Sequence, residues 1–173
     1  MTDVQRQATQ LRDSVSSRER FMEAVLESVI DYAIIALDPQ GLVVSWNEGA
    51  HRILGWTEAE MLGKPVSLFF TDQDRADGIP QAEIDTTLAA GRCIGERWHL
   101  RRDGTCFWAS GEMMPLLDRD GCRLGYIKIL RDRTEQQLAL QEQREETEFL
   151  RGVLASSADC IKVLDLKGRV TFV

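Results

Sequence analysis

Residues 101–134 read RRDGTCFWASGEMMPLLDRDGCRLGYIKILRDRT. Asp-Gly pairs stand at 103–104 and 120–121, and Asp-Gly between β-rich runs is the strongest short-range signal for a β-hairpin. The pairs separate three β-rich runs: residues 94–102, 105–117 and 122–131. The sequence therefore predicts three consecutive antiparallel strands that lead directly into a helix beginning at Thr134.

Upstream, the pattern predicts a first hairpin and then a helical stretch. Residues 32–37 and 42–46 are β-rich, and the segment Asp38-Pro39-Gln40-Gly41 between them has turn composition. The polar residues 71–78 are expected to form a loop. Pro80 suits the first turn of a helix, which is expected to run to Ala90 and to stop at a glycine.

Capping signals divide the segment between the hairpin and this helix. Asn47 is placed to cap a short helix, and Gly55 is placed to end it. Thr57 followed three residues later by Glu60 is a capping box, which predicts a second short helix. Residues 66–70 form a short apolar segment after the next glycine and proline.

Five short segments carry a recognisable pattern: 46–50 (WNEGA), 55–64 (GWTEAEMLGK), 101–108 (RRDGTCFW), 125–126 (GY) and 131–134 (RDRT). Together they resemble the PAS domain family over about residues 21–135. The resemblance implies an α+β fold, in which a five-stranded antiparallel sheet carries short helices on one face. Amphipathic helices are expected before and after it.

An internal repeat sets the expected domain boundaries. Phe21, Val25 and Leu26 recur at the same spacing as Phe149, Val153 and Leu154. After a gap of one residue, the Asp-Gly spacing of the first hairpin turn recurs as well, at 165 and 168. We therefore expect a helix over 1–28, a PAS domain over 29–133, a linker helix over 134–155 and the truncated start of a second PAS copy over 156–173.

The first helix carries apolar residues at heptad spacing. The residues expected to mediate dimerisation along this seam are Val4, Leu11, Val15, Met22 and Val25. The pattern predicts pairing with a second copy of the chain. An amphipathic helix folded back on its own domain would show the same stripe and stays open as an alternative.

The family resemblance implies that the space between sheet and helices often holds a small molecule. The candidate pocket residues are aromatic, apolar or amide side chains: Trp46, Asn47, Trp56, Trp98, Trp108 and Met113. Aromatic side chains can stack on a flavin, so FAD stays open beside an unidentified ligand and no ligand at all. The cofactor is therefore unknown from the sequence.

Two kinds of cofactor chemistry are not expected. Val66 stands where light-sensing members of the family carry the cysteine that forms a covalent flavin adduct. Haem-binding members use a histidine on the helix that here ends near Ala90, and that helix has none. His51 and His99 are the only histidines, and we expect surface or ordinary hydrogen-bonded roles for both.

The resemblance also implies a route for signals, from the last strand into the following helix. Asp132 and Thr134 stand at that junction, where their side chains can cap free backbone N–H groups. We expect a sensory and dimerising input domain of a larger signalling protein, with a histidine kinase output beyond residue 173. A ligand-free interaction scaffold and a flavin-based redox sensor are the alternatives.

Composition excludes several other classes. The net charge of −7 disfavours binding to nucleic acid, and no apolar run approaches the length of a membrane span. No nucleophile–base pair or phosphate-binding loop indicates an enzyme in this segment. The four scattered cysteines indicate buried thiols rather than a metal or redox motif, and the whole predicts a cytoplasmic protein.

Overall fold

The computed structural model describes residues 17–156, 163–164 and 170–172, with side chains described from 17 to 152. The chain divides into two compact units, Met1–Arg133 and Thr134–Val173. None of the helices in the described ranges is long and apolar enough to cross a lipid bilayer.

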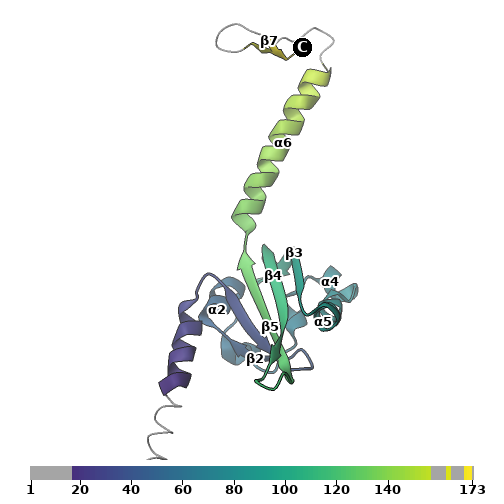
Figure 1. Ribbon diagram of the computed structural model, residues 1–173. Coiled ribbons are helices and arrows are strands. Elements are labelled where there is room, and N and C mark those ends of the chain that lie inside the picture. Colours follow the sequence, from purple (N-terminus) through teal and green to yellow (C-terminus); the bar gives the residue numbers. More distant parts are fainter. Residues whose placement is uncertain (1–16, 157–162, 165–169, 173) are drawn as a thin grey trace, which may run out of the picture. The chain divides into compact units, whose positions relative to one another are not determined.

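The first unit is built on a five-stranded sheet in the order β2-β1-β5-β4-β3 (Figure 1). The strands are β1 Ala33–Leu37, β2 Val43–Trp46, β3 Cys93–Leu100, β4 Cys106–Leu117 and β5 Arg123–Asp132. Every neighbouring pair is antiparallel. The predicted order of two strands, helices and a three-stranded meander is therefore confirmed.

Short helices connect the second and third strands. They are α2 Glu48–Leu54, α3 Glu58–Met61, the 3-10 helix η1 Val66–Phe69, α4 Asp72–Ala76 and α5 Ile79–Ala90. The predicted caps are in place: Asn47 accepts a hydrogen bond from the N–H of Ala50, and Gly55 ends α2 with a positive φ of 85°. The capping box also forms, because the N–H of Thr57 donates to Glu60 at 2.9 Å.

The expectation of a loop over residues 71–78 is wrong, because α4 lies within it. Thr71 caps this helix: its Oγ1 accepts from the N–H of Asp74 at 3.2 Å and donates to the Asp74 carboxylate at 2.9 Å. Arg75 in the last turn reaches back to the carbonyl of Phe70 at 2.8 Å. A polar composition thus concealed one helical turn that is held by its own side chains.

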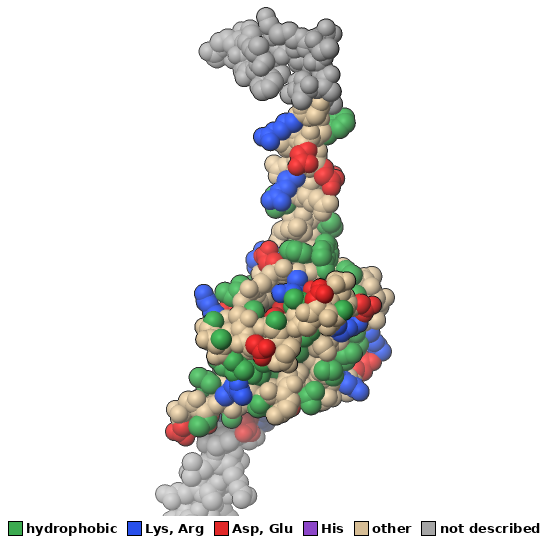
Figure 2. Space-filling view, turned by 90° about the vertical axis from the view of Figure 1, so that its right-hand side faces the viewer, with side chains coloured by type: hydrophobic (Ala, Val, Ile, Leu, Met, Phe, Trp, Pro, Cys, Tyr) green, Lys and Arg blue, Asp and Glu red, His purple; other side chains and the backbone are tan. Residues whose placement is uncertain are grey.

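The core lies between one face of the sheet and these helices. On β4, Phe107, Ala109 and Met113 are buried on that inner face, while Cys106 opposite them is exposed. The expectation of buried cysteines is wrong for Cys106 and also for Cys122. On the face drawn in Figure 2, positive and negative side chains of this unit are mixed.

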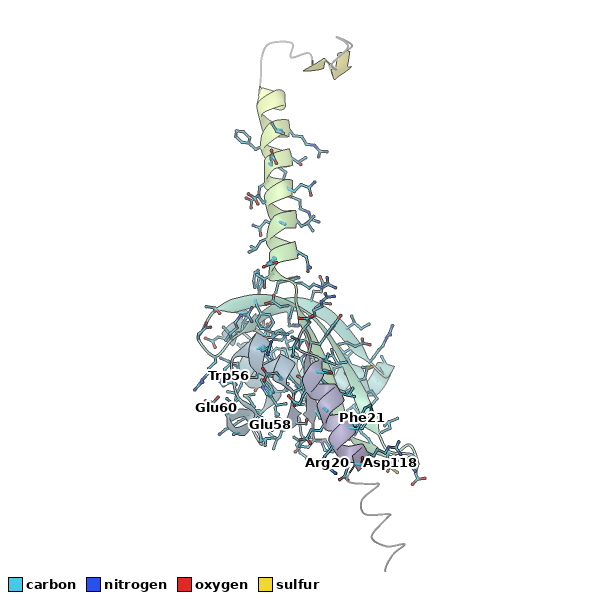
Figure 3. The ribbon with its side chains drawn as sticks, turned by 90° about the vertical axis from the view of Figure 1, so that its left-hand side faces the viewer. Arg20, Phe21, Trp56, Glu58, Glu60 and Asp118 are labelled. Carbon is cyan, nitrogen blue, oxygen red and sulfur yellow. The ribbon has the colours of Figure 1, made fainter. Side chains whose placement is uncertain are left out.

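A helix over residues 17–28 precedes the sheet, and all of its side chains are exposed. Its apolar side chains include Phe21, 67% exposed, and Met22, 52% exposed. Phe21 is labelled on this helix in Figure 3. The end of this helix is tied to α2, because the N–H of Glu48 donates to the Glu27 carboxylate at 2.9 Å, and pairing with a second copy stays a prediction. Three of the predicted seam residues, Val4, Leu11 and Val15, lie outside the described residues.

The second unit begins with α6, Thr134–Ser156, and contains a short pair of strands, β6 Val163–Leu164 and β7 Val170–Phe172. Leu164 pairs with Val170, as Leu37 pairs with Val43 in the first unit, so both partners shift by 127 positions (37 to 164 and 43 to 170). The register irregularity after Val163 matches the one after Ala36. The internal repeat therefore extends from sequence to strand pairing.

Candidate functional site

The interior of the first unit is lined by a chain of aromatic rings. Phe70 and His99 lie edge to face with ring centroids 4.8 Å apart, and His99 lies 5.9 Å from Phe107. Phe69 links this group to Trp46, at 6.1 Å between ring centroids. These rings are supplied by η1, β2, β3 and β4. A shift of any one of these elements therefore moves rings of the same cluster.

His99 is a buried histidine with a defined hydrogen bond. Its Nδ1 lies 2.9 Å from the carbonyl oxygen of Phe69, and because a carbonyl only accepts, Nδ1 carries the proton. Burial, with a smaller contribution from the charge of Lys128, lowers the pKa of His99 from 6.5 to about 3. The ring is therefore neutral at physiological pH. Sequence reasoning allowed a hydrogen-bonded histidine here but did not indicate its complete burial.

This lowered pKa makes folding depend on pH. The pKa of His99 is about 3 in the folded chain and 6.5 in the unfolded chain. Between these two pH values the unfolded chain binds a proton that the folded chain does not, so stability is lost as the pH falls below 6.5. We expect the free energy of unfolding to drop by about 2 kcal/mol between pH ~7.5 and pH ~5. Chemical denaturation across this range measures the slope. His99→Phe should remove it, and His51→Gln, which alters an exposed histidine, should keep it; an unchanged slope in His99→Phe would contradict the assignment.

A buried network of charges joins α5 to the sheet, and sequence analysis missed it. Glu83 of α5 forms an ion pair with Lys128 of β5, and its other carboxylate oxygen lies 3.1 Å from Nε of Arg97 on β3. Arg97 also faces Asp74 of α4 at 3.6 Å. The side chains of Lys128 and Glu83 are only 3% and 9% exposed. Lys128 lies on the same face of β5 as the buried residues Tyr126 and Leu130, two positions away on either side. This period-two pattern is the sequence signal that could have revealed a buried lysine.

The surroundings of Lys128 are apolar apart from this network. Its ammonium nitrogen lies 4.8 Å from the centre of the Phe70 ring. Burial lowers the pKa of Lys128, and the neighbouring charge of Glu83 opposes that shift. Burial, followed by the charge of Glu83, raises the pKa of the Cys93 thiol, so Cys93 is held in its neutral form. Among the described side chains, no group of three or more His, Cys, Asp or Glu could hold a metal ion.

Four of the six predicted pocket residues belong to the interior or its wall. Trp46 and Met113 are buried in the core, and Trp56 packs against it. The indole N–H of Trp46 donates to the carbonyl of Trp56 at 2.9 Å. In Figure 3, Trp56 lies beside Glu58 and Glu60 of the α3 segment.

Asn47 serves as a structural brace. Its Oδ1 accepts from the N–H groups of Ile34 and Ala50 at 2.8 and 2.9 Å. Its Nδ2 lies 3.1 Å from each of three carbonyl oxygens, those of Leu26, Val29 and Tyr32. The amide thus ties the start of α2 to the chain that enters β1, and its polar atoms are all engaged with the backbone.

Trp98 and Trp108 do not line the interior, and their assignment to the pocket is wrong. They are register partners on β3 and β4, with rings 5.4 Å apart in an edge-to-face contact. Their neighbours His99 and Phe107 point to the buried face, so these two tryptophans point to the opposite face of the sheet. Trp98 is 37% exposed there.

The predicted signalling junction contains an arginine that the sequence did not reveal. Arg101, just after β3, forms an ion pair with Asp132 at the end of β5 and donates to the carbonyl of Ile53 in α2. Its guanidinium carbon lies 4.3 Å from the centre of the buried Phe107 ring. The N–H of Arg133 donates to the carbonyl of Trp108 at 2.8 Å, and Thr134 then begins α6. One side chain therefore contacts a helix, the core and the last strand.

A shallow hollow of about 350 Å³ lies beside this arginine, lined by Gly55, Arg101, Arg102 and Asp103. Arg102 is held there by its N–H, which donates to the carbonyl of Leu54 at 2.9 Å, and by an ion pair with Glu60. Arg101 and Arg102 thus connect the end of α2 to the turn between β3 and β4, and Arg101 also contacts the end of β5.

A family model described as the PAS fold matches residues 20–133. The chain belongs to the PAS family. The two-component system protein A of Emericella nidulans is 38% identical over 115 residues, which cover 66% of this chain and 17% of that protein. The sensor protein FixL of Bradyrhizobium diazoefficiens is 27% identical over 146 residues, which cover 79% of this chain and 28% of that protein. The chain thus spans less than a third of these curated relatives.

Solved PAS structures have the same fold. A PAS domain from Colwellia psychrerythraea aligns with a TM-score of 0.61 at 25% identity and covers 67% of this chain and 97% of its own. An RNA-binding light-oxygen-voltage receptor aligns with a TM-score of 0.60 at 21% identity and covers 75% of this chain and 37% of its own. The match to the second shows the fold alone. The PAS assignment made from the sequence is confirmed.

Proposed function

We propose that this PAS domain is the sensory input part of a larger signal-transduction protein, in which Arg101 and Asp132 pass the state of the interior to α6. The single observation that supports this route is the set of contacts made by Arg101, which joins Ile53 of α2, the core ring of Phe107 and the carboxylate of Asp132. The names of the two relatives, a two-component system protein and a sensor protein, support the class of protein.

The route has a simple physical basis. A displacement of the core rings moves Phe107, and the guanidinium that lies on this ring moves with it or loses its contacts. Asp132 then changes position at the last residue of β5, only two residues before α6 begins. Small shifts of a packed core are transmitted in this way because tightly packed elements respond as rigid bodies.

We propose the following organisation for the whole protein. Residues 29–133 form the PAS domain between a helix over 1–28 and a signalling helix over 134–155, and residues 156–173 begin a second PAS copy. The shared register of the two strand pairs supports the repeat. The output activity, which we propose to be a histidine kinase, belongs to another part of a cytoplasmic protein.

We also propose that the flanking helices pair two copies of the chain. Met22 and Val25 are exposed on the first helix, and Phe149 and Leu150, 71% and 54% exposed, lie on α6. Pairing would remove these apolar side chains from water. A monomer found by light scattering at tens of micromolar would refute the dimer without affecting the PAS assignment.

The transmission route is tested by Arg101→Met. This change removes the contacts to Ile53 and Asp132 together, so we expect amide hydrogens at the start of α6, over residues 134–140, to exchange about tenfold faster. The free energy of unfolding should fall by only about 1.5 kcal/mol, because the ion pair is partly exposed. Hydrogen exchange followed by mass spectrometry measures the first effect, and urea denaturation measures the second.

The neighbouring Arg102→Met provides the matched control. Arg102 pairs with Glu60 of α3 rather than with β5, so exchange in α6 should stay as in the wild type. Equal exchange in α6 for both variants and the wild type would place the route elsewhere. In the full-length protein, Asp132→Ala and Thr134→Ala should uncouple the output from the input while the fold persists.

One observation favours a second candidate, a scaffold that binds partners without any ligand. In the described residues, every buried side-chain nitrogen and oxygen has a hydrogen-bond partner, so the interior is satisfied as it stands. Native mass spectrometry that finds no bound small molecule, together with a purified protein that has no visible absorption, would favour the scaffold over the ligand or flavin sensor.

A further inference from the structure

The charged network has the form of a receptor for a carboxylate. Lys128 and Arg97 are both held on the inner face of the sheet, on β5 and β3, and both converge on the Glu83 carboxylate. The two cations come from the sheet, whereas the carboxylate comes from α5. A rigid surface therefore presents two positive groups, and a separate helix supplies the anion that neutralises them.

The other contacts of α5 with the sheet are mainly apolar, because the helix packs on β3 and β4 and Ile84 belongs to the hydrophobic core. Only Glu83, Ile84 and Thr87 are buried in this helix of 12 residues. The hydroxyl of Thr87 donates to the carbonyl of Glu83 within the helix and lies at the limiting distance of 3.5 Å from the carbonyl of Met113. The Glu83 carboxylate is therefore the main polar attachment of α5 to the strands.

Exchange of one carboxylate for another beside Lys128 and Arg97 costs little electrostatic free energy. Removing one member of a buried ion pair leaves the other charge buried without a partner, which is strongly destabilising. A ligand carboxylate that takes the place of Glu83 leaves both cations paired, and the released Glu83 regains its hydration in water. A neutral ligand would leave Lys128 unpaired, so the network selects for an anion.

We propose that Lys128 and Arg97 form a binding subsite for a small organic carboxylate, which Glu83 occupies in this structure and from which a ligand displaces it. The inference rests on the proposed sensory function and names the class of ligand. Displacement of Glu83 releases α5 from the sheet, and this release is the event that the domain reports.

The surroundings define the ligand further. Phe70 lies against the ammonium of Lys128, and the ring of His99 lies against Phe70, so the body of the ligand meets aromatic surface. Arg97 is 25% exposed and Asp74 is 21% exposed, so an incoming carboxylate meets Arg97 first. An aromatic or aliphatic monocarboxylate matches this combination of two cations and apolar walls.

The first test uses Glu83→Ala with acetate. This substitution removes a CH2–COO⁻ group, which acetate replaces atom for atom. We expect acetate to raise the melting temperature of Glu83→Ala saturably, by at least about 4 °C, or to restore folding if the variant is unfolded without it. Acetamide and sodium chloride at equal concentration should not do so, and neither should acetate added to Glu83→Ala/Lys128→Met. Equal effects of acetate, acetamide and chloride would overturn the subsite.

The second test uses the wild-type chain with phenylacetate and, as a neutral match, phenylacetamide. Calorimetry should show saturable binding of phenylacetate alone, and hydrogen exchange in residues 79–90 should rise on binding because α5 is released. Lys128→Met/Glu83→Gln should bind phenylacetate at least about tenfold more weakly. Binding without faster exchange in α5 would overturn the displacement. Neither test uses α6, so a failure here is separate from a failure of the Arg101 route.

Discussion

Asn47→Ala is expected to lower the free energy of unfolding by about 4 kcal/mol, which combines a lost helix cap at about 1 kcal/mol with several part-buried backbone groups that each lose a hydrogen bond at about 1 kcal/mol. The side chain of Asn47 is only 3% exposed, and its amide bonds to part-buried backbone groups. The groups that lose a partner include the N–H of Ile34 and the carbonyls of Leu26, Val29 and Tyr32. Urea denaturation monitored by circular dichroism measures the loss.

Two further variants separate the cap from the brace. Asn47→Ser can still cap α2 but is too short to reach the three carbonyls, so it should recover only about 1 kcal/mol. Thr57→Ala removes the cap of α3 at an exposed site and should cost about 1 kcal/mol. If Asn47→Ala cost no more than Thr57→Ala, the contacts with the entering chain would contribute nothing to stability.

The difference between Asn47 and Thr57 illustrates what the sequence predicts well. Both caps were predicted because a cap is a local signal, read within four residues of the helix start. The additional role of Asn47 joins it to Leu26, 21 positions earlier, and no local pattern indicates that contact. The same limit applies to Arg101, whose acceptor carbonyl belongs to Ile53, 48 positions away.

The tryptophans show a second limit. Residues alternate between two faces along β4, and both faces carry an aromatic residue, Phe107 on one and Trp108 on the other. The helices cover the face that carries Phe107, because Ala109 and Met113 are buried on the same side. Which face is covered depends on the path of the chain after β2, and the composition of a single strand does not determine it. The type of aromatic residue was therefore a poor guide to the pocket.

The charged network escaped prediction for a related reason. Glu83 is one of two acidic residues on α5, the other being Asp85, and 45 positions separate it from Lys128. The two side chains meet only because α5 packs on β3 and β4, beside β5, so the pair is a product of tertiary structure. Of the two residues, only Lys128 could have been recognised from the sequence, because it lies on a buried strand face and lysine is seldom fully buried without a partner.

Lys128→Met is expected to destabilise the fold by about 3 kcal/mol or more, because it leaves the buried Glu83 carboxylate with Arg97 alone. Methionine keeps the length and the apolar stem of lysine, so the change removes the charge with little change of volume. The remaining partner is 25% exposed and lies 3.1 Å from one carboxylate oxygen only. Urea denaturation at neutral pH measures the loss of unfolding free energy.

The double variant Lys128→Met/Glu83→Gln decides the cause of that loss. Glutamine keeps the shape of Glu83 and removes its charge, so no unpaired anion stays in the core, and an uncharged pair at a buried site is often as stable as the ion pair it replaces. We therefore expect the double variant to lie within about 1 kcal/mol of the wild type, so the second substitution should restore about 2 kcal/mol of the stability that Lys128→Met loses. If the double variant were as unstable as Lys128→Met, packing rather than the stranded charge would be the cause. In that case Lys128 would be a space-filling residue, and the network would no longer account for the attachment of α5 to the sheet.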